Sequence, residues 1–409
     1  MPELIVALPE GGSLEALERA SNLPPFGPVQ QSFAAALSRQ LTTSPATRAH
    51  PELVSLGFWL RAANVARLAQ AFAAAHAGRV HLPRGLVFHV APSNVDTIFV
   101  YSWFVSLLCG NRNVLRISSR ESAQTSALLD VLRGLLAQPE WREIATRTLV
   151  VRYGHEAEIT QDLCARCDMR VVWGGDATIA ALRAFPLAPH ATELAFANKF
   201  SCSVIDAASL LACDPAALER LGQAFYNDAY WFGQMACSSP RMVFWLGTDD
   251  AVREAALRFW PAVGRALDAH ETQIAPADSV SKEVAVDSLA IEQAGVRIDT
   301  HDPRMTLAWM TSARIRDELH CGAGLFHETR IDSIAELQPH LTRKVQTVSQ
   351  FGVSPEQWRE FLAGALPRGI DRIVPIGQAL DFGPVWDGFD LIASFLREVT
   401  ILPAAAARA

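Results

Sequence analysis

The chain has 409 residues, half of them hydrophobic, which is enough to bury a large core and predicts about two or three domains. Its formal charge is −7 and it contains no strong basic run, so the composition argues against a surface that binds nucleic acid through phosphate contacts. We therefore expect no nucleic-acid partner.

The first 75 residues are rich in alanine and leucine and predict a helical N-terminal layer. Apolar residues follow helical spacing between Phe58 and Phe72, whereas prolines interrupt the earlier part. The opening residues, Met1 to Leu4, lack the basic region and apolar block of a secretory signal. We therefore expect a cytoplasmic protein.

Short apolar strands and helices alternate in the next segment, residues 76–198. Strands are predicted at residues 85–90, 113–117, 148–152 and 169–173, and helices at residues 97–108, 123–136, 156–164 and 178–184. Continuous apolar strands separated by helices are typical of a parallel sheet that is covered on both faces. The segment is therefore predicted to be a doubly wound α/β domain.

The longest apolar stretch, Val95 to Cys109, belongs to this segment. It contains Asp96 and two serines, and it is shorter than the roughly 20 residues that a membrane span needs. We expect a buried helix here and no membrane span.

A second α/β unit is predicted from residue 199 to 345. It starts with a strand at residues 200–205 and a helix at 216–225, and a turn containing Cys237 then leads into a strand at 242–246. Residues 346–409 are denser in glycine and proline and are expected to pack back on the two domains.

The seven cysteines form an odd, scattered set, unlike the dense spacing of a secreted disulfide scaffold, and we expect reduced thiols. Cys164 and Cys167 form a Cys-x-x-Cys pair, but no second pair completes a zinc site. Coincidence of helical spacing is the preferred interpretation of this pair, and no metal is expected.

Several common catalytic and nucleotide motifs are missing. The sequence has no Gly-x-Gly-x-x-Gly after the first strand, no P-loop, no His-Glu-x-x-His and no Gly-x-Ser-x-Gly. Because parallel sheets bind ligands at the carboxyl ends of their strands, three polar turns should lie at one edge. They are residues 92–94 (Pro-Ser-Asn), 118–120 (Ser-Ser-Arg) and 174–175 (Gly-Gly).

These features in this order resemble the aldehyde dehydrogenase superfamily, and more closely the LuxC-like long-chain acyl-CoA reductases. The resemblance covers about residues 80–400. Its markers are Pro92-Ser93-Asn94-Val95, the run from Gly110 to Ser119, Trp173-Gly174-Gly175, the run from Asn227 to Arg241, and Asp371 to Phe382 with Trp386-Asp387-Gly388. It implies an aldehyde dehydrogenase-like fold, with a parallel-sheet cofactor domain followed by a second α/β catalytic domain.

The resemblance implies roles for three catalytic residues. Cys237 matches the nucleophilic cysteine, which would form an acyl-enzyme. Asn94 matches the amide that stabilises the oxyanion, although an Asn can equally cap the following helix. Glu193 lies where aldehyde dehydrogenases carry a water-activating glutamate, but Ala195-Phe196 replaces two glycines there. A reductase should restrain this carboxylate or use it as a proton donor, and a solvated carboxylate is the alternative.

The resemblance also implies a nicotinamide dinucleotide. Arg116 stands where the superfamily has a lysine near the adenosine ribose, and Ser119 replaces an acidic residue. Because a lost carboxylate removes repulsion against a 2′-phosphate, and Arg116 or Arg120 could pair with one, NADPH is favoured over NADH. A surface-charge role for Arg120 is the alternative. The remaining cofactor-binding residues expected are Ser93, Ser118, Gly174 and Gly175, although a plain tight turn would also need the two glycines.

The leading prediction is an NADPH-dependent reductase that converts a fatty acyl thioester, carried by CoA or by a protein, to a fatty aldehyde. A non-acylating aldehyde dehydrogenase, a cofactor-independent thiol acyltransferase or thioesterase, and a non-catalytic subunit are the alternatives. The expected partners are the acyl donor and either further copies of the chain or an acyl-activating protein.

Overall fold

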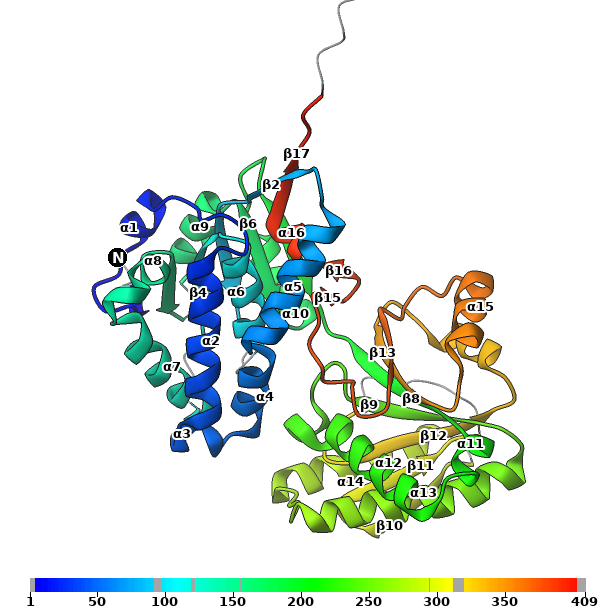
Figure 1. Cartoon of the computed structure of the whole chain (residues 1–409). Helices are drawn as coiled ribbons and strands as arrows, with labels where there is room; N and C mark the ends of the chain where they lie inside the picture. Colours follow the sequence, from blue (N-terminus) through cyan, green and yellow to red (C-terminus); the bar gives the residue numbers. More distant parts are fainter. Residues whose placement is uncertain are drawn as a thin grey trace, which may run out of the picture. The chain divides into compact units, whose positions relative to one another are not determined.

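The computed structural model describes residues 4–91, 98–118, 122–154, 156–293, 295–311 and 320–402. The chain divides into two units (Figure 1). Unit 1 comprises Met1–Ala197 and Phe382–Ala409, and unit 2 comprises Asn198–Asp381. Within the described residues, no helix is long and apolar enough to cross a membrane.

Unit 1 is built on a six-stranded sheet in the order β1-β5-β4-β3-β6-β7. Its strands are β1 (Ile5–Leu8), β3 (Leu86–Val90), β4 (Arg112–Arg116), β5 (Thr148–Arg152), β6 (Met169–Trp173) and β7 (Thr192–Phe196). All neighbours are parallel except β1, which runs antiparallel to β5. The strands predicted by the sequence are therefore present, with bounds that agree within one residue.

Helices complete unit 1. They are α1 (Leu14–Arg19), α2 (Pro28–Thr43), α3 (Pro45–Arg48), α4 (Pro51–Trp59), α5 (Ala62–Ala75), α6 (Ile98–Leu108), α7 (Ala123–Leu136), α8 (Arg142–Ala145), α9 (Ala157–Arg166), α10 (Asp176–Arg183) and α16 (Leu391–Phe395), with the 3-10 turn η1 (Pro139–Trp141). Two small sheets join β2 (Val80–Pro83) to β17 (Leu396–Val399) and β15 (Val385–Trp386) to β16 (Phe389–Asp390).

Strand β3 shows why the sheet is covered on both faces. Leu86, Phe88 and Val90 pack in a core with residues of α9 and α10, whereas His89 points to the other face and contacts Ser102 of α6. A strand buried on both faces reads as a continuous apolar run, which is the pattern found in the sequence.

Strand β1 is a difference from the expected helical N-terminal layer of residues 1–75. The apolar residues Ile5 to Leu8 pair with Val150 to Arg152 of β5 instead of forming a helix. Four residues are too few to show a helical or strand period, and the pairing partner lies about 140 residues away in the sequence.

Unit 2 contains a seven-stranded sheet in the order β10-β11-β12-β9-β8-β13-β14. Its strands are β8 (Phe200–Asp206), β9 (Pro240–Leu246), β10 (Arg297–Asp302), β11 (Met305–Trp309), β12 (Leu325–Ile331), β13 (Val345–Phe351) and β14 (Arg372–Pro375). Only the edge strand β10 is antiparallel to its neighbour. The helices are α11 (Ala207–Leu211), α12 (Pro215–Tyr230), α13 (Asp249–Ala269), α14 (Pro276–Glu292) and α15 (Pro355–Ala365), with 3-10 turns η2 (Trp231–Gln234) and η4 (Ile334–His340).

The two faces of this sheet have separate cores. Val243 and Trp245 of β9 pack with α12 and α13, and Met242 and Phe244 pack with α14, α15 and η4. The alternation along β9 places successive side chains on opposite faces, so both units are α/β layers as the sequence predicts.

Candidate functional site

The loop that carries Cys237 has an unusual backbone. Helix α12 ends at Tyr230, and Phe232, Gly233 and Gln234 then take φ angles of 57°, 59° and 65° before β9 begins at Pro240. Non-glycine residues rarely take positive φ, and such conformations cost of order 1–3 kcal/mol each. The surrounding contacts must therefore hold this loop in place.

Gln234 supplies three of these contacts. Its side chain is completely buried, and its Nε2 donates hydrogen bonds to the carbonyl oxygens of Pro240 and Leu325, each at 3.0 Å. Its Oε1 accepts from the backbone N–H of Gly324 at 3.0 Å. Gln234 thus joins the cysteine loop to the first residues of β9 and β12.

Cys237 follows this loop and is half-buried. Its carbonyl oxygen accepts a hydrogen bond from Ser201 Oγ at 2.8 Å, and its sulfur accepts one from Gln346 Nε2 at 3.4 Å. Gln346 is fully buried at the start of β13, so its amide is fixed in position. An amide donor aimed at a partly accessible sulfur stabilises negative charge there, which is what a nucleophilic thiolate requires.

The other cysteines are less suited to this role. All seven are free, and Cys109, Cys164, Cys167 and Cys202 are buried. Burial raises the pKa of Cys202 to about 12, and it also raises the pKa of the half-buried Cys321. A buried thiol with a raised pKa is a poor nucleophile. The sulfur of the half-buried Cys213 donates to the carbonyl oxygen of Ser209 at 3.5 Å, whereas that of Cys237 accepts from an amide, so Cys237 is the strongest candidate.

In unit 1, the sheet order brings together the ends of β3, β4 and β6, which precede the predicted cofactor turns. Val90 at the end of β3 lies opposite Arg116 of β4 on one side and Val172 of β6 on the other. The chain leaves β3 toward β4 and β5 and returns to pair β6 on the other side of β3. This is a topological switch point, where open α/β sheets bind ligands. Of the predicted residues at this edge, Ser93, Asn94, Ser119 and Arg120 lie outside the described residues.

Arg116 and the two glycines lie at this edge. Arg116 donates from Nη2 to the carbonyl oxygen of Gly154 at 2.6 Å, and its guanidinium stacks 4.7 Å from the centre of the Tyr153 ring. Gly175 precedes α10, and a side chain added there would meet nothing within 4 Å. The neighbouring Trp173 Nε1 is buried and has no hydrogen-bond partner within the described residues.

These groups fit a dinucleotide in part. Three donors suit a phosphate-bearing ligand: the guanidinium of Arg116, the backbone N–H at Gly175 and the indole N–H of Trp173. Asp176, the first residue of α10, places a carboxylate in the same turn and opposes a phosphate there. A phosphate group is therefore accommodated better beside Arg116 than at the N-terminus of α10.

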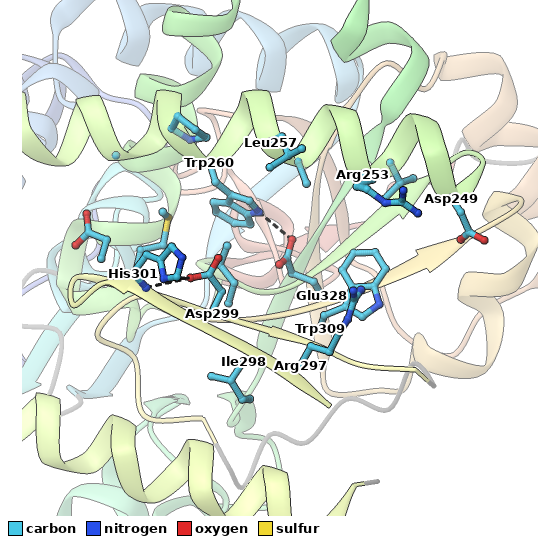
Figure 2. A pocket seen from close by; sticks show the side chains of 17 residues that line it. Asp249, Arg253, Leu257, Trp260, Arg297, Ile298, Asp299, His301, Trp309 and Glu328 are labelled. Carbon is cyan, nitrogen blue, oxygen red and sulfur yellow. Dashed lines mark hydrogen bonds and ion pairs between the residues drawn. The ribbon is translucent and has the colours of Figure 1, made fainter. Parts of the chain in front are cut away.

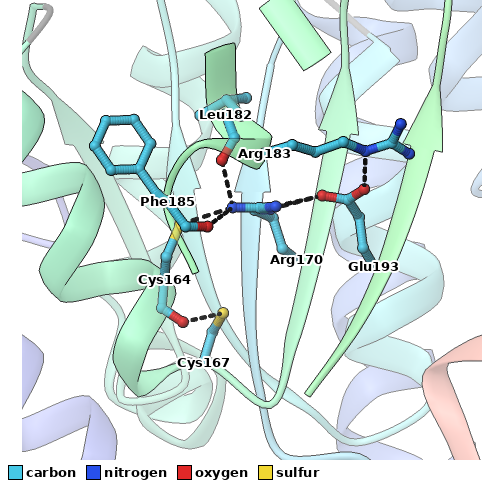
Figure 3. A network of polar contacts seen from close by, with 7 residues as sticks. All are labelled: Cys164, Cys167, Arg170, Leu182, Arg183, Phe185 and Glu193. Atoms are coloured by element: carbon cyan, nitrogen blue, oxygen red, sulfur yellow. Dashed lines mark hydrogen bonds and ion pairs between the residues drawn. The ribbon is translucent and has the colours of Figure 1, made fainter. Parts of the chain in front are cut away.

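Glu193 is engaged in an ion-pair network (Figure 3). On β7, its Oε2 accepts hydrogen bonds from Nε and Nη2 of Arg170 on β6, at 2.9 and 2.5 Å, and its Oε1 accepts from Arg183 Nε at 2.8 Å. Burial raises the pKa of Glu193, but the bonds from Arg183 and Arg170 outweigh it and hold the pKa below the ordinary value. The carboxylate is therefore ionised and restrained, which suits neither a proton donor nor a solvated side chain.

Cys164 and Cys167 belong to the same network. Arg170 Nη1 donates to Cys164 Sγ at 3.1 Å and to the carbonyl oxygens of Leu182 and Phe185, and Cys167 Sγ lies 3.5 Å from the carbonyl oxygen of Cys164. Among the residues that the structure describes, no group of three or more His, Cys, Asp or Glu side chains could hold a metal ion.

Comparison with known proteins identifies the family. The family model described as acyl-CoA reductase (LuxC) matches residues 73–398. The chain belongs to the LuxC acyl-CoA reductase family. A curated relative, "Long-chain acyl-protein thioester reductase 2" of Photobacterium leiognathi, is 26% identical over 170 residues, which are 41% of this chain and 33% of that protein. The match thus spans about a third of the relative's length.

Solved structures show the fold of this LuxC family member. An oxidoreductase from Marinobacter aquaeolei gives a TM-score of 0.67 at 12% identity, covering 95% of this chain and 88% of that one. A methylmalonate-semialdehyde dehydrogenase from Oceanimonas doudoroffii gives 0.64 at 15% identity, covering 100% and 93%. A putative enzyme of the same name from Sinorhizobium meliloti, complexed with NAD, gives 0.62 at 14% identity, covering 96% and 89%. The predicted aldehyde dehydrogenase-like fold and LuxC family are confirmed.

Two residues of interest were missed by the sequence analysis. Gln346 contacts the Cys237 sulfur, and Asp228 of α12 accepts hydrogen bonds from the backbone N–H groups of Gly377 at 2.7 Å and Ala379 at 2.9 Å. Asp228 therefore links two of the segments that carry the LuxC resemblance. Gln346 stands among other polar residues of β13, and Asp228 follows Asn227 in α12, so no local pattern singled out either residue.

Proposed function

We propose that this LuxC family member reduces a fatty acyl thioester to a fatty aldehyde through an acyl-enzyme on Cys237. The observation that carries the proposal is the half-buried Cys237 sulfur, which accepts a hydrogen bond from the fixed amide of Gln346 in a chain of this family. The thiolate attacks the thioester carbonyl carbon, the bond from that carbon to the carrier sulfur breaks, and the carrier leaves as a thiolate.

The proposal assigns the reductant to NADPH. When bound, reduced nicotinamide supplies the hydride that converts the acyl group to the aldehyde, with release of the Cys237 thiolate. Arg116, Ser118, Gly174 and Gly175 would hold the dinucleotide. NADPH is preferred to NADH because Ser119 stands where an acidic residue would repel a 2′-phosphate, and Arg116 and Arg120 could pair with one.

The roles of the other predicted residues follow from the same proposal. Asn94 and Ser93 keep the oxyanion and cofactor roles that the family resemblance implies. For Glu193 we propose restraint by Arg170 and Arg183 in place of catalysis, because both of its oxygens accept hydrogen bonds from guanidinium groups. A carboxylate held in this way does not activate water efficiently, and an acyl group on Cys237 then survives long enough to be reduced.

Mass spectrometry tests the acyl-enzyme directly. The protein is incubated with palmitoyl-CoA without NADPH, digested and searched for a palmitoyl adduct. We expect the adduct on Cys237 in the wild type and in the matched variant Cys213→Ala, which removes another half-buried thiol, and none in Cys237→Ala. An unmodified Cys237 with both palmitoyl-CoA and a palmitoylated acyl carrier protein would overturn the proposal.

Absorbance of the reduced cofactor tests the direction of the chemistry. With palmitoyl-CoA, NADPH should be consumed and hexadecanal formed. Oxidation of hexadecanal to acid without any reduction of the thioester would identify a non-acylating dehydrogenase. Hydrolysis or transfer of the acyl group at the same rate without nicotinamide would identify a thioesterase or acyltransferase. Parallel reactions with the CoA and carrier-protein donors decide between the two thioester classes.

Gln346 is proposed as a positioning residue for Cys237. Because hydrogen bonds to charged groups contribute about 1.5–3 kcal/mol, Gln346→Ala should slow alkylation of Cys237 by iodoacetamide about tenfold or more at neutral pH. Gln273→Ala, at an exposed site of the same unit, is the control. Equal alkylation rates in the two variants would remove this role from Gln346.

A further inference from the structure

Unit 2 contains a cavity that the proposed reaction does not use. It has a volume of about 750 Å³ and lies between α13 and the edge strands β10 and β11 (Figure 2). Cys237 and Gln346 are not among the residues that line it. Its size is within the range of small-molecule sites, and its walls combine aromatic and charged side chains.

Glu328 of β12 is the polar group at the base of this cavity. The residue is only 4% exposed, and its Oε1 accepts hydrogen bonds from both Trp245 Nε1 at 2.7 Å and Trp260 Nε1 at 2.9 Å. Its Oε2 has no hydrogen bond from any described residue. Two indole donors thus fix the carboxyl group and leave its second oxygen able to accept from a further donor.

The walls around Glu328 are suited to an apolar body with a positive end. Trp260 and Trp309 present aromatic rings, and Arg297 already lies 5.6 Å from the centre of the Trp309 ring. Cations interact favourably with such rings at this range. Met305 and Leu307 add apolar surface beside them.

The charge of the lining also favours a cation. It carries the carboxyl groups of Asp249, Asp299, Asp302 and Glu328 beside the guanidinium groups of Arg253 and Arg297 and one histidine, and Arg330 and Arg304 pair with Asp249 and Asp302. An anion would still meet the carboxyl groups of Asp299 and Glu328. A neutral acyl chain would fill the apolar part but offer Glu328 Oε2 no donor.

We propose that this cavity binds a small organic cation, a protonated amine on an aromatic or short aliphatic body, with the ammonium group donating to Glu328 Oε2. The body packs between Trp260 and the side chains of β11. The site is independent of Cys237 and of the acyl chemistry proposed above.

Calorimetric titration of the full chain with 2-phenylethylamine tests the proposal, with 3-phenylpropionate as the anionic counterpart of similar size. We expect the amine to bind and the anion not to bind. Burial raises the pKa of Glu328 to about 7, so the titration is run at pH 8, where Glu328→Gln should weaken binding of the amine about tenfold or more because it removes the charge that the ammonium meets. The exposed Glu356→Gln, on α15 of the same unit, should leave it unchanged.

A second variant tests the cavity without altering its charge. A Cβ atom added at Gly264, which lines the cavity in α13, meets no atom within 4 Å. We therefore expect Gly264→Leu to extend into the cavity and abolish amine binding while the protein stays folded. Gly364→Leu, which also enters open space on a helix, is the matched control. Absence of amine binding at millimolar concentration, equal affinity in Glu328→Gln, or equal binding of 3-phenylpropionate would each overturn the proposal.

Discussion

Replacing Gln234 by alanine tests how the cysteine loop is held. The substitution removes three hydrogen bonds of 3.0 Å each, to the carbonyl oxygens of Pro240 and Leu325 and from the N–H of Gly324, inside a fully buried site. At about 1 kcal/mol for each bond, we expect a loss of about 3 kcal/mol in the free energy of unfolding of unit 2. The three consecutive residues with positive φ have a strained backbone, so the loop depends on these hydrogen bonds to keep its conformation.

Native-state hydrogen exchange measures this loss for unit 2 by itself, through the slowest-exchanging amides of β9 and β12. Gln273→Ala removes only an exposed contact of 3.5 Å to the carbonyl oxygen of Glu271 and should change the free energy by less than about 0.5 kcal/mol. A change in Gln234→Ala no larger than in Gln273→Ala would refute the reasoning, because the buried amide would then contribute nothing to the loop or to the strands that it joins.

Three further substitutions test other contacts. Arg170→Met should destabilise unit 1 by about 3–5 kcal/mol, measured by hydrogen exchange in β6, because it leaves buried acceptors unpaired, whereas the exposed Arg183→Met should cost less than about 1 kcal/mol. Burial raises the pKa of Asp228 to about 7, so the folded state binds the Asp228 proton more tightly than the unfolded chain does. This contribution to the free energy of unfolding is lost as the pH rises from about 4 through 7. In chemical denaturation, Asp228→Asn should reduce this loss of stability with pH, whereas Asp250→Asn, at an exposed site, should not. Gly222→Ala would place a methyl group 2.6 Å from the backbone of Ala262 and should cost about 1–3 kcal/mol by thermal or chemical denaturation, whereas Gly364→Ala, which meets nothing within 4 Å, should stabilise its helix slightly.

The elements that the sequence predicts best have a clear pattern of apolar residues. Strands β5 and β6 are short, buried and mostly apolar, helix α7 is amphipathic with Ser122 as its N-cap, and all three have the predicted bounds. Helix α12 extends five residues beyond its predicted end at Phe225. The extension contains Asp228, whose carboxylate is bonded to backbone N–H groups about 150 residues later, and no local pattern reports such a partner.

The cysteine was the easiest part of the site to predict, because its neighbours Gly233 and Gln234 mark a turn before an apolar strand. The contacts that act on it come from distant segments. Gln346 reaches the sulfur from β13, and Ser201 reaches the carbonyl oxygen from β8. Parallel sheets bring together residues that are far apart in the sequence, so the identity of the sulfur's partner required the strand order as well as the motif.

The role of Glu193 follows from the buried charge of Arg170, which is visible in the sequence of β6. Arg170 stands in the apolar run of β6 and is only 2% exposed, and a buried guanidinium is strongly unfavourable unless it is paired with a carboxylate. Glu193 lies directly opposite in the neighbouring strand β7, and it satisfies that requirement. The same pairing that stabilises the sheet removes the freedom that a base for water would need. Under the proposed acyl-enzyme mechanism, this pairing favours loss of the acyl group by reduction, since hydrolysis activated by Glu193 would require a carboxylate that the sheet has already engaged.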